Sequence, residues 1–176
     1  MRQAEHQPEH DHLAFSGREP YEEVADLHRQ AVDAVDRIEA ASFGADRFAR
    51  RNLSRLLRSP SAATLIAEME GRPLGYVLLL FRKGATAARL YSLATAPDAR
   101  GQGTARALVD AAVLKALDRG CASVRLEVRE SNLRARRLYD AAGFDVIARK
   151  PAYYDDGETA LQMQKRLDMR KRAQRQ

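Results

Sequence analysis

The stretch that decides the fold is Pro97-Asp98-Ala99-Arg100-Gly101-Gln102-Gly103-Thr104-Ala105. It joins an apolar run ending at Thr95 to a helical pattern beginning at Thr104. Its glycines let the backbone turn tightly and approach a ligand without Cβ clashes. The start of a helix offers N–H groups without intrahelical partners and the positive end of the helix dipole. The stretch therefore suits a binding site for an anion such as a diphosphate, and a turn without a ligand is the alternative.

The segments on either side of this loop are typical of an α/β layered domain with a mixed sheet. Apolar residues recurring at helical spacing predict helices at 21–41, 46–58, 104–119 and 132–143. Apolar or alternating runs predict strands at 62–69, 74–81, 88–95, 123–128, about 144–152 and 159–166. The order is two helices, three strands, a helix, a strand, a helix and two strands. A first strand before them is not placed by the pattern.

Length and composition indicate one globular domain. The chain has 176 residues, of which 45% are hydrophobic and 31% charged, a balance that supports a packed core. No apolar run approaches the roughly 20 residues that span a bilayer, and the N-terminus up to Glu19 lacks a signal-peptide core. We expect a cytoplasmic protein that binds no membrane, with a flexible tail at 1–18, a domain at 19–167 and a basic C-terminal tail at 168–176.

The formal net charge is +6, and the basic residues are spread over helices and the C-terminal tail. They form no block with interleaved aromatics, so a nucleic-acid partner is not expected. A phosphate-rich cofactor would account for part of the excess. The single Cys121 excludes an internal disulfide and is expected as a small buried hydrophobe. His6, His10 and His12 lie in the predicted tail, without the fixed geometry of a metal site, so no metal is expected.

The loop Arg100-x-x-Gly103-x-Ala105 resembles the Arg/Gln-x-x-Gly-x-Gly/Ala motif of the GNAT superfamily of N-acetyltransferases. The preceding Leu93–Pro97 resembles the strand that this family has before the loop. Leu126–Asn132 and Leu138–Phe144 resemble its second signature, at the family's spacing. The resemblance covers residues 21–167. Within the superfamily the sequence looks most like the RimI-type ribosomal-protein alanine N-acetyltransferases, through Leu-Glu-Val-Arg, Ser-Asn and the paired tyrosines before Asp-Gly-Glu.

The resemblance implies the GNAT fold: a mixed, mostly antiparallel sheet that is splayed between strands 4 and 5, with flanking helices. It also implies direct transfer of an acetyl group from acetyl-CoA, as co-substrate, to a primary amine. The residues that it assigns to acetyl-CoA are Leu93, Ala94, Thr95, Arg100, Gly101, Gln102, Gly103, Thr104, Ala105, Asn132, Arg134 and Tyr139. Further arginines that could meet the phosphates are Arg106 and Arg137, and a solvated surface role is the alternative for each arginine.

Two catalytic residues follow from the same resemblance. Glu127 matches the general base of the RimI type, acting through water, and Tyr139 matches the acid that donates to the thiolate sulfur. A phenol with a pKa near 10 stays protonated at neutral pH, as an acid requires. The alternative for Glu127 is a strand carboxylate paired with Arg125 or Arg129. The alternative for Tyr139 is an aromatic residue of a helix that only packs.

Residues expected to contact the acceptor are Phe43, Tyr153 and Tyr154, and packing in the core or at a sheet edge is the alternative for the two tyrosines. The loop at 42–46 lacks the Pro-Trp that relatives often carry there. The acidic residues Asp155, Asp156 and Glu158 either attract a cationic amine or form a solvated turn.

The predicted acceptor is the N-terminal α-amine of a protein. A small amine, such as a polyamine, an amino acid or an aminoglycoside, is the first alternative. A non-catalytic domain that binds acyl-CoA is the second. The chain is expected to be a monomer or a homodimer.

Overall fold

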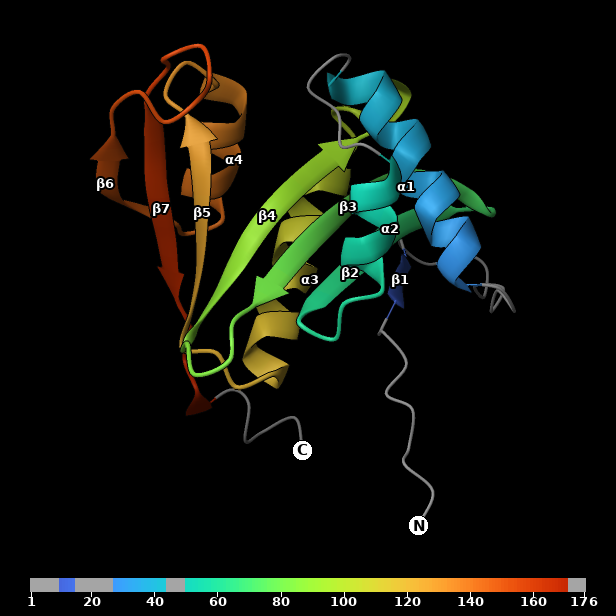
Figure 1. Cartoon of the computed structure of the whole chain (residues 1–176), viewed down its shortest axis with the longest axis horizontal. Coiled ribbons are helices and arrows are strands. Elements are labelled where there is room, and N and C mark those ends of the chain that lie inside the picture. The colour runs from blue at the N-terminus through green and yellow to red at the C-terminus, as the bar shows by residue number, and fades with distance from the viewer. Residues whose placement is uncertain (1–9, 15–26, 44–49, 171–176) are drawn as a thin grey trace. The chain divides into compact units, whose positions relative to one another are not determined.

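The computed structural model describes residues 10–14, 27–43 and 50–170 (Figure 1). The chain divides into two compact units. Unit 1 comprises the described residues of Met1–Leu79 and Ser92–Leu108, and unit 2 comprises those of Leu80–Tyr91 and Val109–Gln176. The helices are α1 (Leu27–Phe43), α2 (Arg50–Leu57), α3 (Thr104–Asp118) and α4 (Leu133–Ala141), with a short 3-10 turn, η2, at Pro97–Ala99. None of the described helices is long and apolar enough to span a membrane.

Seven strands form one sheet in the order β1-β2-β3-β4-β5-β7-β6. Their bounds are β1 His10–Ala14, β2 Ala62–Met69, β3 Arg72–Phe81, β4 Ala87–Thr95, β5 Ser123–Arg129, β6 Asp145–Lys150 and β7 Ala160–Arg166. The pairs β1–β2 and β4–β5 are parallel, whereas β5–β7 and β6–β7 are antiparallel. The neighbours β2–β3 and β3–β4 are joined by short turns, which require antiparallel strands. The mixed, mostly antiparallel sheet is therefore confirmed.

The ladder between β4 and β5 is short. It pairs Ala87–Arg89 with Ser123–Arg125, at the beginning of both strands. On its other side β5 pairs with β7 along its whole length, up to Arg129. The second half of β5, which carries the predicted base Glu127, therefore lies beyond the β4–β5 ladder and pairs with β7.

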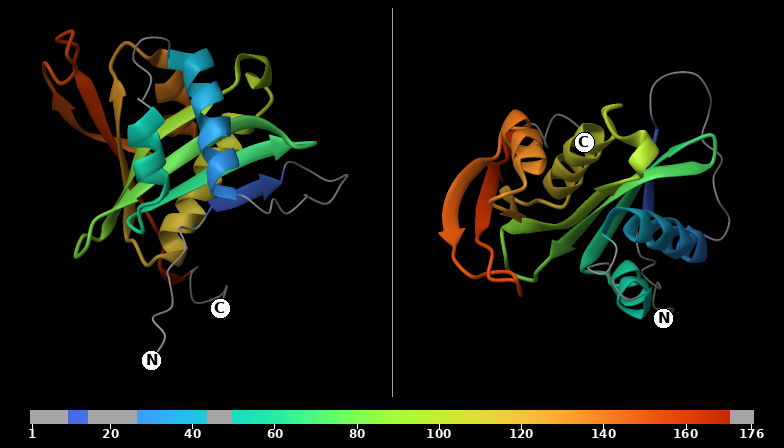
Figure 2. Two further views of the ribbon diagram at one scale, coloured as in Figure 1. Left: turned by 45° about the vertical axis from the view of Figure 1, so that its right-hand side comes forward. Right: turned by 90° about the horizontal axis from the view of Figure 1, so that it is seen from above.

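Unit 1 has its core around β3. Residues 74–79 are all buried, as the continuous apolar run predicts for a strand covered on both faces. The helices α1 and α2 lie over one face of β2 and β3 (Figure 2). The Tyr76 hydroxyl donates to the buried Glu39 carboxylate of α1 and lies 2.6 Å from Ser92 Oγ of β4. This polar link joins α1 to both strands, and its apolar surroundings raise the pKa of Tyr76 through burial.

Unit 2 has its core where α4 meets the sheet. The predicted alternation of buried and exposed residues in β5 is confirmed, because Val124, Leu126 and Val128 are buried while Arg125 is exposed. In Figures 1 and 2 α4 lies over one face of β5 and β7. The buried residues Phe144 and Met163 complete this core.

Most predicted elements are confirmed, with differences at their ends. Residues 10–14 form β1 inside the segment predicted to be a tail. This strand pairs with β2 through backbone groups, so no apolar pattern in the sequence indicates it. The predicted helix at 21–41 is observed from Leu27 and continues to Phe43. Residues 21–26 and 46–49 lie outside the described part. Strand β6 ends at Lys150 rather than near 152, because Pro151 cannot donate to a ladder and Ala152 has φ +50°.

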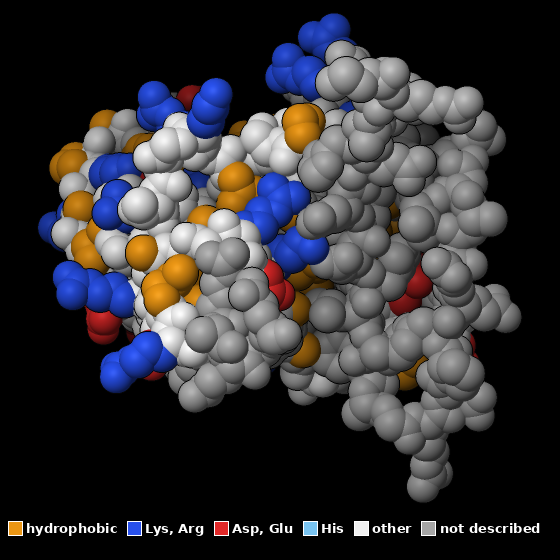
Figure 3. All heavy atoms as spheres, turned by 90° about the horizontal axis from the view of Figure 1, so that it is seen from below, with side chains coloured by type: hydrophobic (Ala, Val, Ile, Leu, Met, Phe, Trp, Pro, Cys, Tyr) orange, Lys and Arg blue, Asp and Glu red, His pale blue; other side chains and the backbone are white. Residues whose placement is uncertain are grey.

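Lysine and arginine side chains are spread over the coloured part of the face shown in Figure 3, with apolar side chains between them. This matches the dispersed basic residues of the sequence. Arg119 illustrates their packing, since its guanidinium lies 4.4 Å from the centre of the Phe81 ring.

Gly75 sets the spacing inside unit 1. A Cβ at this position would lie 2.8 Å from the carbonyl oxygen of Ala94 and 3.0 Å from Leu108 Cδ1. The backbone oxygen cannot move away, so only glycine lets β3 lie this close to β4 and to the first turns of α3. Gly75 therefore controls where the loop before α3 lies relative to β3.

Gly75→Ala is expected to lower the free energy of unfolding by about 1–3 kcal/mol, as overpacking does. Gly75→Val should lower it further. Urea denaturation measures both, with Arg72→Ala at the exposed start of β3 as the control, since it removes only a surface ion pair with Asp98. Wild-type stability in Gly75→Val would contradict the steric argument.

Candidate active site

The loop between η2 and α3 lies in unit 1 and is built around two left-handed glycines. Gly101 has φ +79° and Gly103 φ +82°, and nothing lies within 4 Å of a Cβ added at either. The carbonyl of Gly103 accepts the first helical bond of α3, from Ala107 N at 3.0 Å. The N–H groups of the first turn of α3, which have no intrahelical acceptors, therefore follow a stretch of backbone without side chains at Gly101 and Gly103.

Side chains within this loop hold its shape. Gln102 Nε2 donates to the carbonyl of Asp98 at 2.8 Å, and Arg72 forms an ion pair with the Asp98 carboxylate. The buried Thr104 hydroxyl donates to Ala99 O at 3.4 Å. The side chains of Gln102 and Thr104 therefore support the loop from within, which leaves backbone groups to contact a ligand.

These features fit a diphosphate. The space beside Gly101 and Gly103 is open, the amides of the first turn of α3 have no intrahelical acceptors, and Arg100 is exposed. Ala105 is half-buried at the second helical position. The loop is therefore compatible with the predicted anion site, in which backbone N–H groups would hold the diphosphate.

The predicted strand before the loop is the end of β4. Ala94 is buried and its carbonyl oxygen lies close to Gly75, whereas Leu93 and Thr95 are half-buried. The carbonyl of Thr95 accepts a bond from Ser42 Oγ of α1 at 3.3 Å. The side chain of Phe43, at the end of α1, lies outside the described part.

In unit 2, Glu127 of β5 is at the centre of a charged cluster. Its side chain is 11% exposed. Oε1 accepts bonds from Lys150 Nζ at 2.9 Å and Gln162 Nε2 at 3.0 Å. Oε2 accepts from Arg89 Nε at 3.0 Å, and Arg89 Nη2 lies 2.9 Å away. Both carboxylate oxygens are thus paired, with Arg89 and Lys150 rather than with Arg125 or Arg129.

These partners set the ionisation of Glu127. Partial burial by itself raises the pKa of the carboxyl group. The hydrogen bond from Lys150 and the positive charge of Arg89 outweigh burial, so that the pKa is lowered from its ordinary 4.5. Glu127 is therefore a carboxylate at neutral pH, and a weak base.

Tyr139 lies in α4 and is 6% exposed. Burial, followed by the influence of Tyr154, raises its pKa above the ordinary 10.0. Its ring packs against Phe144, with ring centres 5.7 Å apart. The phenol is therefore protonated throughout the physiological range, so the roles of packed aromatic and proton donor are compatible.

The segment between β6 and β7 carries the paired tyrosines. The rings of Tyr153 and Tyr154 meet edge to face with centres 5.1 Å apart. Tyr153 is 40% exposed, and its hydroxyl accepts a bond from Arg89 Nη2 at 3.0 Å. The ammonium of Lys150 lies 5.3 Å from the centre of its ring. Tyr153 thus borders the Glu127 cluster directly.

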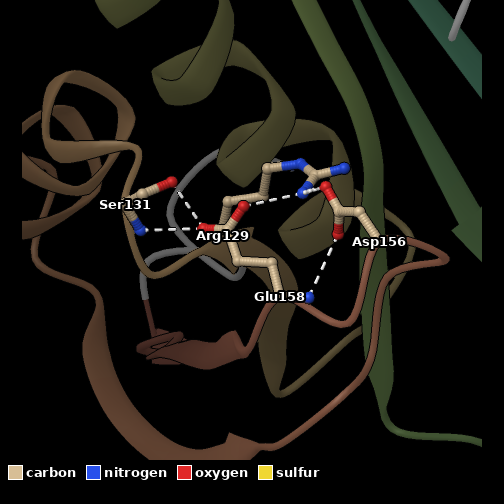
Figure 4. Close-up of polar contacts among 4 residues, drawn as sticks. All are labelled: Arg129, Ser131, Asp156 and Glu158. Atoms are coloured by element: carbon tan, nitrogen blue, oxygen red, sulfur yellow. Dashed lines mark hydrogen bonds and ion pairs between the residues drawn. The ribbon is translucent and has the colours of Figure 1, made fainter.

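The acidic turn after the tyrosines is already paired with a cation. Arg129 Nη1 lies 2.7 Å from Asp156 Oδ2 and 2.7 Å from Glu158 Oε2 (Figure 4). Arg129 therefore pairs with both carboxylates, while the Asp156 side chain remains 58% exposed. Asp155 is exposed.

Asn132, which the resemblance assigns to acetyl-CoA, has a structural role in the protein. Its Oδ1 accepts a bond from Ala135 N at 3.1 Å, so it caps the N-terminus of α4. Arg134 and Arg137 are exposed on that helix. An assignment of Asn132 to acetyl-CoA therefore depends on its remaining amide group.

Arg89, Lys150 and Gln162 were not predicted as partners of Glu127, and Arg129 was considered only as a partner of that carboxylate. Arg89, Lys150 and Gln162 come from β4, β6 and β7, and only the sheet order brings them together. Gln162 faces Glu127 in the β5–β7 register, which the sequence does not determine. Cys121 is buried as expected, and burial raises its thiol pKa. No group of His, Cys, Asp and Glu side chains suited to a metal lies in the described ranges.

The sheet order and the loop of left-handed glycines before α3 agree with the fold that the family resemblance implies. The chain belongs to the acetyltransferase (GNAT) family, whose model matches residues 22–144. Enzymes of this family transfer the acetyl group of acetyl-CoA to an amine, so the GNAT fold and the transferase class predicted from the sequence are confirmed.

Individual relatives support this membership. An uncharacterized N-acetyltransferase of Methanocaldococcus jannaschii is 33% identical over 141 residues, covering 77% of this chain and 85% of the relative. A Bacillus subtilis protein provisionally named a ribosomal protein bS18-alanine N-acetyltransferase is 32% identical, covering 80% and 92%. The crystal structure of the Escherichia coli ribosomal-protein-S18-alanine N-acetyltransferase superimposes with a TM-score of 0.70 at 26% identity, covering 78% and 88%.

The charged cluster predicts a pH-dependent contribution to stability. Because the pKa of Glu127 is lowered by folding, its ion pairs stabilise the chain above pH 4.5 and are lost as pH falls through the lowered value. Glu127→Gln should be less stable than wild type by about 1 kcal/mol at pH 7, and the difference should shrink below about pH 4. Urea denaturation across this range measures it, with Glu70→Gln in the exposed β2–β3 turn as control. A difference independent of pH would contradict the assigned ion pairs.

Proposed function

We propose that this enzyme acetylates the N-terminal α-amine of a protein, with acetyl-CoA as the acetyl donor. The observation that carries the proposal is the environment of Glu127. Its carboxylate is bound by Lys150, Gln162 and Arg89, and its pKa is lowered. Such a group can accept a hydrogen bond from an amine or a water molecule, but it withdraws protons weakly.

A weak base selects an acceptor that is already partly neutral. An α-amine with a pKa near 8 is about 10% neutral at pH 7, whereas a lysine amine near 10.4 is neutral to only about 0.04%. The difference corresponds to roughly 3 kcal/mol of deprotonation. The arrangement around Glu127 therefore favours an N-terminus over a lysine side chain.

The relatives favour the same acceptor. The Bacillus subtilis and Escherichia coli proteins are named for acetylation of the alanine of ribosomal protein S18. The first of them aligns with most of this chain and with 92% of its own length. A ribosomal protein with an N-terminal alanine is thus the first acceptor to test.

Each residue then has a role in one transfer. Backbone N–H groups at Gly103, Thr104 and Ala105 hold the diphosphate, with Arg100 beside them. When bound, acetyl-CoA supplies the thioester carbonyl that the amine attacks. Glu127 orients the amine or its proton-accepting water, and the Tyr139 phenol donates to the departing sulfur. Its raised pKa keeps that proton available.

The acceptor side is assigned to Tyr153 and Tyr154, together with Phe43. Tyr153 is exposed and lies next to Glu127 through Arg89. An exposed aromatic ring next to this cluster offers an apolar surface for the first residue of the acceptor. Leu93, Ala94, Thr95, Asn132 and Arg134 stay assigned to the acetyl-CoA side.

Acetyl transfer to a matched panel of acceptors tests the proposal. The panel contains an Ala-initiated peptide with one lysine, the same peptide with its N-terminus blocked, spermidine and an aminoglycoside, and mass spectrometry locates the label. We expect the free N-terminus to be acetylated at least about 100-fold faster than the lysine, from the difference in neutral fraction. Preferential labelling of the blocked peptide or a small amine would reject the N-terminal assignment.

The same panel includes a variant control. Tyr139→Phe should lower kcat by about 100-fold or more, as loss of a general acid does, with an acetyl-CoA KM close to wild type. Tyr91→Phe, which keeps the exposed ring next to Arg89 on β4, should retain the wild-type rate. Equal rates for both variants would remove Tyr139 from the mechanism.

A further inference from the structure

Three segments that carry proposed site residues are joined by a cluster of side chains around Arg129. Arg129 is the last residue of β5, two positions after Glu127. The segment 151–158 carries Tyr153 and Tyr154. Ser131 immediately precedes Asn132, the cap of α4, which carries Tyr139. Figure 4 shows the four residues that join them, here called the Arg129 cluster: Arg129, Ser131, Asp156 and Glu158.

Glu158 connects two of these segments. Its Oε2 pairs with Arg129 Nη1 at 2.7 Å, while its Oε1 accepts bonds from the backbone N–H of Ser131 at 3.0 Å and from the Ser131 hydroxyl. The carbonyl of Glu158 accepts bonds from Tyr153 N at 3.1 Å and Tyr154 N at 3.2 Å. The residue that Arg129 binds therefore also holds the backbone of both tyrosines.

Asp156 closes the turn from the other side. Its Oδ2 pairs with Arg129 Nη1 at 2.7 Å, and its Oδ1 accepts a bond from Glu158 N at 3.1 Å. Arg129 also stacks on Tyr154, with its Cζ atom 4.1 Å from the ring centre. One guanidinium thus contacts both carboxylates and a tyrosine ring of the same segment.

We propose that Arg129 is a positioning residue that determines how the acceptor binds, by fixing the Tyr153–Tyr154 segment against β5 and the start of α4. This inference rests on the proposed function, in which the two tyrosines contact the acceptor. Arg129 acts through Tyr154 and Glu158. Its contribution is the order of the segment before the acceptor arrives, which reduces the entropy lost on binding.

The chemistry of the cluster calls for arginine. A planar guanidinium donates to two carboxylates and stacks on an aromatic ring at the same time, whereas a lysine ammonium is a compact point charge. The side chains are partly exposed, at 33% for Arg129, 58% for Asp156 and 26% for Glu158. Ion pairs this exposed add little to global stability. The effect of the cluster is therefore expected on the local segment.

Two charge states support this reading. The bonds from Ser131 and then the ion pair with Arg129 lower the pKa of Glu158 to about 2. A backbone bond from Glu158 and the bond from Arg129 lower the pKa of Asp156 as well. Both carboxylates thus remain charged, and the segment remains held, well below neutral pH.

The test compares Arg129→Lys with Arg125→Lys. Arg125 is an exposed arginine of the same strand that bonds to Gln164 and is outside the cluster. Hydrogen exchange of the Tyr153, Tyr154 and Gly157 amides reports the order of the segment without any substrate. Exchange should accelerate about tenfold in Arg129→Lys, the order expected when a charge-assisted hydrogen bond is lost, and should stay at the wild-type rate in Arg125→Lys.

Kinetics then separate positioning from stability. In Arg129→Lys the KM for the acceptor peptide should rise about tenfold, while the acetyl-CoA KM stays within twofold of wild type. The melting temperature should change little, because the cluster is exposed. Unchanged exchange, or equal rises in both KM values, would overturn the proposal.

A carboxylate titration followed by NMR keeps the two proposals separable. In Arg129→Lys the Glu158 pKa should rise from about 2 towards its ordinary 4.5, and Ser131→Ala should shift it in the same direction. If wild type acetylates no acceptor, the proposed function fails, while exchange and titration still decide whether the cluster orders the segment. If wild type is active and the Arg129→Lys segment keeps wild-type exchange, the positioning role alone fails.

Discussion

The left-handed backbone at Gly101 and Gly103 is the constraint on which the donor side of this enzyme depends. Residues with a Cβ rarely adopt φ near +80°, so the glycines let the chain leave η2 and enter α3 directly. The helix therefore begins with amides that have no intrahelical acceptors, after two glycines whose Cβ positions are open. Gly75 adds a second condition, because a side chain there would collide with Ala94 O and Leu108, at the start of α3. We propose that this backbone, more than basic side chains, binds the diphosphate.

In unit 2 the chemistry depends on how charges are paired. Glu127 is bound by Arg89, Lys150 and Gln162, which keep it ionised and weaken it as a base. Tyr139 is buried, and its proton is retained. One group is ready to accept a hydrogen bond and the other to donate one. These opposite pKa shifts have different origins, since neighbouring cations lower the first and burial raises the second.

The sequence predicted nearly every described helix and strand, because apolar periodicity and turn residues are local signals. It also identified the glycine loop, whose conformation follows from residue type. The partners of Glu127 were not predictable in the same way, because Arg89, Lys150 and Gln162 are brought together by the sheet order, in which β7 lies between β5 and β6. The nearby Arg125 and Arg129 looked like better partners in sequence, yet they bond to Gln164 and to the acidic turn. The sequence alone did not distinguish two roles of Asn132. An asparagine at this position suits both the cap of α4 and a contact with a ligand.

The central claim, that amides at the start of α3 bind the diphosphate of acetyl-CoA, is tested most directly by calorimetric titration with two donors. Acetyl-CoA contains the diphosphate, whereas acetyl-pantetheine carries the same thioester without it. Loss of two or more charge-assisted hydrogen bonds should weaken acetyl-pantetheine binding at least about 100-fold relative to acetyl-CoA. Equal affinities for the two compounds, or no binding of acetyl-CoA at millimolar concentration, would contradict the claim.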